Sequence, residues 1–96
     1  MLMPLSNGKL VFEGAYAAIP ANTQGALIRY VERKILPGGF LCAVLCNDLF
    51  TAVGAADSGN LSALKLIVQY VYNNLPGSCY GSKEKIYRYV NECIAA

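Results

Sequence analysis

Proline and glycine residues divide the apolar part of this chain into short segments. Pro37-Gly38-Gly39 and the run from Asn73 to Gly77 are strong helix breakers, and Asp57-Ser58-Gly59-Asn60 is a turn signal. Within the segments between these breakers, apolar residues recur at helical spacing. No apolar stretch approaches the roughly 18 residues that a membrane-spanning helix needs. The pattern predicts short helices that pack on one another, and no membrane partner.

The spacing predicts an all-α fold, a compact bundle of about four short helices that forms a single domain over residues 19–96. Asn60 and Ser82 are residue types that cap helix N-termini, and Glu84 would follow Ser82 in a first helical turn, where the helix dipole favours an acidic residue. The third helix is apolar on several faces and is expected to be central. The helices are expected from Ile19 to before Pro37, from about Phe40 to Ala56, after Asn60, and after Ser82.

Residues 1–18 do not continue this pattern. Ser6-Asn7-Gly8 is a turn signal, and the β-prone run from Lys9 to Glu13 predicts a short extended N-terminal arm, too short for an independent sheet. Met1 to Asn7 has neither the basic region nor the long apolar region of a signal peptide. We therefore expect an intracellular protein with reduced cysteines.

The four cysteines predict packing more readily than metal binding. Cys42 and Cys46 are four residues apart on one predicted helix face, whereas zinc sites usually add a second pair of ligands. Cys79 and Cys93 lie far from them in the sequence, and the chain contains no histidine. We expect buried apolar thiols, no metal and no cofactor.

The apolar surface of this chain exceeds what four short helices can bury. Apolar residues make up 55% of the sequence and charged residues 15%, where soluble domains average about 25% charged. We therefore expect a homo-oligomer, a two-fold dimer or a multiple of it. Its interface is expected on the third and fourth helices, at Tyr70, Tyr72, Tyr87 and Tyr89. The competing view is a monomer whose arm folds back over the apolar surface.

Two polar residues, Asn47 and Asp48, interrupt the apolar stripe of the predicted second helix. A buried polar side chain without a hydrogen bond costs several kcal/mol. Two interpretations stay open: Asp48 binds a loop backbone or caps a neighbouring helix, or the pair forms a pocket wall that recognises the hydroxyls or base edge of a ligand. The stripe itself is expected to comprise Phe40, Leu41, Val44, Leu45, Leu49 and Val53.

The stretch from Pro76 to Ser82 is a second candidate, because two glycines and two serines lead into a predicted helix N-terminus. Its backbone N–H groups, with Lys83 and Lys85 alongside, are suited to a phosphate. Tyr80 offers a ring for stacking. The Walker pattern is absent, so an ordinary interhelical turn with a capping serine remains the other interpretation.

The inventory of side chains argues against an enzyme and against a duplex nucleic-acid binder. Two Asp, four Glu and no His leave no carboxylate pair or imidazole as a general base. A net charge of +2 is too mild for a dedicated DNA or RNA binder.

A longer pattern covers about four-fifths of the chain, outside the arm. It reads Ile19-Pro20-x-x-Thr23, Leu27-x-x-Tyr30-Val31, Pro37-Gly38-Gly39-Phe40-Leu41-x-Ala43-Val44-Leu45-x-Asn47-Asp48-Leu49-Phe50-x-Ala52-Val53-Gly54-x-Ala56-Asp57, Ile67-Val68-x-x-Val71-Tyr72-Asn73, Pro76 and Cys79-Tyr80-Gly81-Ser82. This pattern resembles a widespread group of small phage and prophage proteins, in which the position of Tyr80 is often Trp. The resemblance implies a phage protein in the bacterial cytoplasm. Small phage proteins are often counter-defence factors, which is an association and not a mechanism.

Together these observations predict a phage counter-defence protein that binds and sequesters a host nucleotide immune signal without catalysis. The expected ligand is a cyclic or ADP-ribose nucleotide. One alternative is a protein-binding inhibitor of a host defence nuclease or CRISPR effector, and another is a structural phage protein. The expected ligand-binding residues are Tyr80, Ser82, Lys83 and Arg88, with Asn47 and Asp48 as polar readers.

Overall fold

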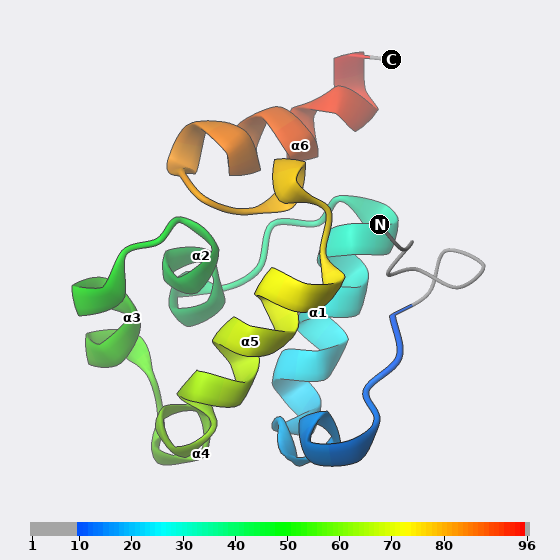
Figure 1. The fold of residues 1–96 in the computed structure, drawn as a ribbon. Helices are drawn as coiled ribbons and strands as arrows, with labels where there is room; N and C mark the ends of the chain where they lie inside the picture. Colours follow the sequence, from blue (N-terminus) through cyan, green and yellow to red (C-terminus); the bar gives the residue numbers. More distant parts are fainter. Residues whose placement is uncertain (1–9, 96) are drawn as a thin grey trace.

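The computed structural model describes residues 10–95, of which residues 92–95 are described by their backbone alone. Within that range the fold is all-α and contains no strand, so the predicted fold class is confirmed (Figure 1). The α-helices are α1 (Ala21–Arg33), α2 (Gly39–Leu45), α3 (Leu49–Ala55), α4 (Ser58–Ser62), α5 (Leu64–Asn74) and α6 (Lys83–Ala95), and two 3₁₀ turns are η1 (Gly14–Ala18) and η2 (Gly77–Cys79).

Helix α5 lies in the middle of the fold, as predicted for the third helix. In Figure 1 it runs between α1 on one side and the α2–α3 pair on the other, while α6 crosses above them. Helices α1, α2 and α5 all contribute to one core, which η2 and α6 close at one end. The fully buried large side chains of this core are Ile19, Leu27, Tyr30, Leu45, Ile67, Tyr70, Cys79 and Ile86.

The predicted single helix from Phe40 to Ala56 is wrong, because the chain stops and restarts a helix at Asn47 and Asp48. Asn47 is left-handed (φ +65°), and its N–H bonds the carbonyl of Val44 at 3.1 Å. The N–H of Asp48 bonds the carbonyl of Ala43 at 2.9 Å, which completes a Schellman motif at the end of α2. The Asp48 carboxylate then accepts the N–H of Thr51 at 3.3 Å and caps α3.

This break turns part of the expected apolar stripe outward. Leu49 is 61% exposed and Val53 is 43% exposed, although both were expected to be buried. Phe50 is the most exposed of the large apolar side chains described, at 87%. The side chains of Asn47 and Asp48 are also exposed, so neither is a polar group buried in a helix.

Two further helix boundaries differ from the prediction. Helix α1 ends at Arg33, four residues before Pro37, because Lys34 adopts the left-handed conformation (φ +58°). Asn60 does not cap the central helix. It lies inside α4, where its N–H bonds the capping Asp57 carboxylate at 2.8 Å, and its side-chain carbonyl accepts the hydroxyl of Thr23 at 2.6 Å.

The start of α6 matches the prediction. The Ser82 hydroxyl accepts the N–H of Lys85 at 3.2 Å, and Glu84 lies in the first turn. Both confirm what the local sequence predicted. The side chains of Cys93 and Ile94, expected in the core, lie outside the described residues.

The described part of the N-terminal arm packs against α5. Leu10 is buried, and the Phe12 ring stacks on Tyr70 with their centroids 4.2 Å apart. The Tyr70 hydroxyl donates to the carbonyl of Val11 at 2.9 Å. The arm therefore covers apolar surface within one subunit, as the competing view expected. Lys9 and the expected turn at residues 6–8 lie outside the described residues, and the domain division at Ala18 stays a prediction.

Tyrosine hydroxyls tie distant segments together. Tyr30 in α1 donates to the carbonyl of Cys79 at 2.7 Å, and Tyr89 in α6 donates to the carbonyl of Val31 at 2.6 Å. Burial raises the pKa of the Tyr30 hydroxyl far above its usual range and that of Tyr70 to about 12. These phenols therefore remain neutral donors at physiological pH.

We predict that Tyr30→Phe lowers the free energy of unfolding by about 1–3 kcal/mol, because it removes a buried hydrogen bond to the Cys79 carbonyl. The matched control is Tyr72→Phe, which deletes the same hydroxyl from a ring that is 71% exposed and should change stability by less than about 0.5 kcal/mol. Urea unfolding followed by circular dichroism measures both. Equal changes in the two variants would contradict the structural role given to Tyr30.

Candidate functional site

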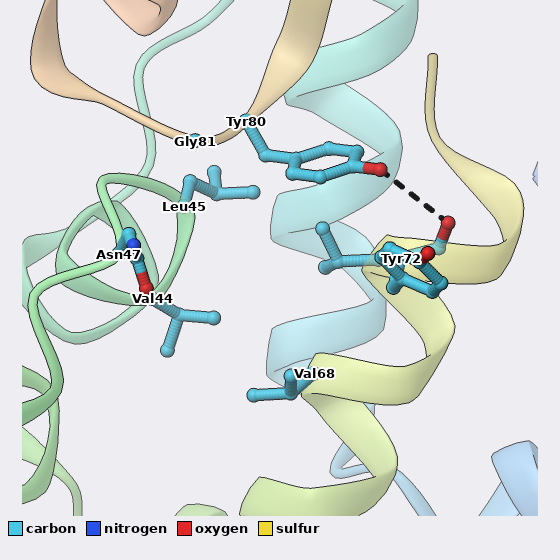
Figure 2. Close-up of a pocket in the computed structure, with 8 residues that line it drawn as sticks. Val44, Leu45, Asn47, Val68, Tyr72, Tyr80 and Gly81 are labelled. Carbon is cyan, nitrogen blue, oxygen red and sulfur yellow. Dashed lines mark hydrogen bonds between the residues drawn. The ribbon is translucent and has the colours of Figure 1, made fainter. Parts of the chain in front are cut away.

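An apolar cavity of about 260 Å³ opens between the end of α2, the face of α5 and the loop that precedes α6 (Figure 2). Three elements distant in the sequence therefore supply its walls. The lining residues are Val44, Leu45, Asn47, Val68, Val71, Tyr72, Tyr80 and Gly81.

The loop wall of this cavity is fixed by the backbone of Gly81. Its N–H donates to the carbonyl of Leu45 at 2.8 Å, which joins the loop to the end of α2. Gly81 has φ +121°, a conformation that side chains with a Cβ rarely adopt. Beside it, the rings of Tyr80 and Tyr72 lie 6.5 Å apart at an angle of 60°, and the Tyr80 hydroxyl lies 3.5 Å from the carbonyl of Tyr72. Figure 2 shows these two rings forming one side of the cavity.

Asn47 supplies the polar group on the opposite side, next to Val44 (Figure 2). Its left-handed backbone ends α2 and places the side chain at the mouth of the cavity. Within the described residues, no hydrogen bond occupies its side-chain amide. That amide offers one acceptor and two donor hydrogens to a bound molecule.

A second cavity of about 210 Å³ continues the first toward α3 and shares Val44, Asn47 and Val68 with it. We call the two together the α2–α5 groove. The second cavity adds Asp48, Leu49, Ala52 and Leu64 to the lining.

The six residues predicted to bind a ligand do not form one site. Asn47 and Tyr80 line the same cavity, and Asp48 lines the adjoining one. The Asp48 carboxylate caps α3, so the helix-capping interpretation is confirmed. The Ser82 hydroxyl likewise caps α6.

The two predicted cations lie elsewhere. Lys83 is near enough to Cys46 for its charge to act on that thiol, but it lines none of the cavities described here. Arg88 lines a separate cavity, formed with Gly77, Ser78, Lys85 and Tyr89.

Sequence reasoning missed most of the apolar lining of the groove. Val68 was assigned to the central helix without a ligand role and Tyr72 to the expected oligomer interface, and both are exposed. Gly81 was noted only as part of the stretch from Pro76 to Ser82 that leads into a helix N-terminus. A usable signal was present in Asn47-Asp48, since asparagine suits a helix C-terminus and aspartate suits the next N-cap.

Two of the described thiols, Cys46 and Cys79, are poor nucleophiles. Burial, together with the adjacent and hydrogen-bonded Cys42, raises the pKa of the Cys46 thiol to about 11. Cys79 is fully buried. Within the described part of the chain, no group of three or more acidic or thiol side chains is arranged to hold a metal ion.

No protein-family model, curated protein or solved structure matches this chain. Among the residues that the structure describes, no helix has the length and apolar character needed to cross a membrane.

We predict opposite effects for two glycine-to-alanine substitutions. Gly81→Ala should lower the free energy of unfolding by about 1–3 kcal/mol, because its φ of +121° is strained for alanine. Gly54→Ala, in α3 with open space around it, should raise that free energy by about 0.5 kcal/mol. Urea unfolding measures both. A Gly81 variant as stable as the wild type would contradict the fixed loop wall.

Proposed function

We propose that this protein is a phage counter-defence factor that sequesters a host nucleotide signal in the bacterial cytoplasm without chemically changing it. The observation that supports this best is the meeting of Tyr80 and Asn47 in one apolar cavity, although they come from distant parts of the sequence. The phage setting rests on the resemblance of the sequence pattern and on nothing in the geometry.

The chemistry of the cavity suits a nucleobase. A base has apolar faces and a polar edge, and stacking on an aromatic side chain contributes about 1–3 kcal/mol. Tyr80 and Tyr72 offer aromatic surface, Val44 offers apolar contact from α2, and Val68 offers it from the turn of α5 that precedes Tyr72 (Figure 2). The free amide of Asn47 can pair with both a donor and an acceptor on the base edge.

The size of the cavity limits which ligands fit. Its volume of about 260 Å³ lies just below the roughly 300–1,000 Å³ of typical small-molecule sites. One base or nucleoside fits this volume better than a whole dinucleotide does. The phosphates of a cyclic or ADP-ribose nucleotide would therefore lie outside it.

The same groove offers little for catalysis. Asp48 is the one carboxylate among its lining residues, and that group is engaged in capping α3. A hydrolase or transferase needs a positioned proton acceptor near the reacting atom. The proposal is accordingly binding and retention of the ligand.

Calorimetry with a panel of cyclic and ADP-ribose nucleotides tests the proposal. Tyr80→Leu should weaken binding about 5- to 150-fold through the loss of stacking. Asn47→Gly should weaken it about tenfold while preserving the left-handed backbone, which glycine adopts readily. The control is Tyr87→Leu, an exposed tyrosine of α6 that lines neither part of the groove.

The nucleotide is also incubated with the protein and then analysed by chromatography. We expect it to be unchanged. Time-dependent product formation by the pure protein would overturn the proposed absence of catalysis. No heat with any nucleotide, or equal heat from wild type and both groove variants, would overturn the groove as a nucleotide site.

A protein partner is the second candidate, favoured by the apolar side chains that α3 presents to solvent. Leu49 and Phe50 are both strongly exposed beside the groove, and contiguous exposed apolar residues usually mark an interface. In this version the protein inhibits a host defence nuclease or CRISPR effector. Co-purification of such a host protein, lost in Phe50→Ser and retained in Tyr87→Ser, supports this candidate over the first.

We also propose that the protein self-associates, with the interface moved from the position first expected. Tyr70 and Tyr89 bind backbone carbonyls within the subunit, whereas Tyr72 and Tyr87 of the expected interface are exposed. The exposed apolar residues of α3, centred on Phe50, form the better candidate surface. A ligand in the adjoining groove would then touch two subunits.

Light scattering at micromolar concentration should give a multiple of the 10.3 kDa subunit mass for the wild type. The Phe50→Ser substitution should lower the measured mass toward that of a single chain, whereas Tyr87→Ser should leave the measured mass unchanged. A wild-type mass near 10.3 kDa would exclude the oligomer. Dissociation by the Tyr87 variant alone would place the interface on α6 instead.

A further inference from the structure

A separate, smaller cavity lies between η2 and α6. Its volume is about 170 Å³, and it shares no lining residue with the α2–α5 groove. Its walls are Gly77 and Ser78 from η2 and Lys85, Arg88 and Tyr89 from α6. We call it the Lys85–Arg88 pocket.

Positive charge dominates this pocket. Lys85 and Arg88 are one turn apart on α6, and none of the described residues that line the pocket is acidic. The ammonium group of Lys85 reaches back over the loop and lies 3.5 Å from the carbonyl of Gly77. Ser78 adds a hydroxyl to the same wall.

Lys34 does not line the pocket, but it lies over the ring of Tyr89, which does. The ammonium group of Lys34 is 3.5 Å from the centroid of the Tyr89 ring, and the Tyr89 hydroxyl is held by the carbonyl of Val31 at 2.6 Å. Lys34 holds a left-handed backbone (φ +58°), which costs a lysine about 1–2 kcal/mol. Lys85 and Arg88 therefore share the pocket with Tyr89, and Lys34 lies over the ring of that tyrosine, in a protein whose net charge is +2.

We propose that the Lys85–Arg88 pocket binds a phosphate group, either free or as the terminal phosphate of a nucleotide. A guanidinium group can bind two phosphate oxygens at once, an ammonium group adds a point charge, and a hydroxyl donates to a third oxygen. The pocket volume of about 170 Å³ is large enough for a phosphate group. This inference goes beyond the groove and does not depend on a base binding there.

The test is an NMR titration of ¹⁵N-labelled protein with inorganic phosphate and with pyrophosphate, against sodium chloride at matched ionic strength. Saturable shifts are expected at the amides of Ser78, Lys85, Arg88 and Tyr89. The double variant Lys85→Gln/Arg88→Gln should bind at least tenfold more weakly. The control Lys65→Gln removes an exposed cation from α5, outside the pocket, and should stay within twofold of wild type.

Two further samples keep the test decisive. Arg88→Lys retains the charge but loses the two-pronged geometry, so it should bind more weakly than wild type and more tightly than the double variant, even if the latter folds poorly. Adenosine diphosphate added to the Asn47→Gly protein should still shift the pocket amides, which separates this site from the groove. Shifts reproduced by sodium chloride, or unchanged in Arg88→Lys and the double variant, would overturn the proposal.

Discussion

One buried hydrogen bond, from the Tyr30 hydroxyl to the Cys79 carbonyl, holds together the parts of the fold that form both cavities. Tyr30 is fully buried in α1, and the bond is 2.7 Å long. It fixes the turn at Cys79, and the residues that follow the turn are Tyr80 and Gly81, which line the groove. Gly77 and Ser78, which precede Cys79 in the turn, line the Lys85–Arg88 pocket. The loop can therefore present two different surfaces because its centre is fixed in the core.

Sequence reasoning succeeded where the determining interaction is local. Pro76 and Gly77 end the central helix, and Ser82 caps the next one, because a breaker or a cap acts on its own turn of backbone. It failed between Val44 and Leu49, where apolar residues keep helical spacing across a break. The spacing depends only on which residues are apolar. It is therefore the same whether or not Asn47 adopts the left-handed conformation that ends the helix. The break decides that α3 faces outward.

The candidate site was only half predictable for a related reason. Tyr80 and Asn47 were singled out by residue type, but their meeting depends on the bond between Gly81 and Leu45, which no sequence pattern shows. Arg88 was grouped with Tyr80 because the two are close in sequence. Helix α6 instead directs it to a different cavity. Grouping residues by their closeness in the sequence therefore identified the elements that line the cavities. It also assigned residues of two separate cavities to one site.

The proposed function depends on the α2–α5 groove receiving a nucleobase. Intermolecular NOEs between a bound nucleotide and valine methyl groups test that claim most directly. If the base binds in the groove, its protons should give NOEs to the methyl groups of Val44 and Val68, which line both parts of the groove. Contacts from the base to Val11 or Val53 and none to Val44 or Val68 would contradict it.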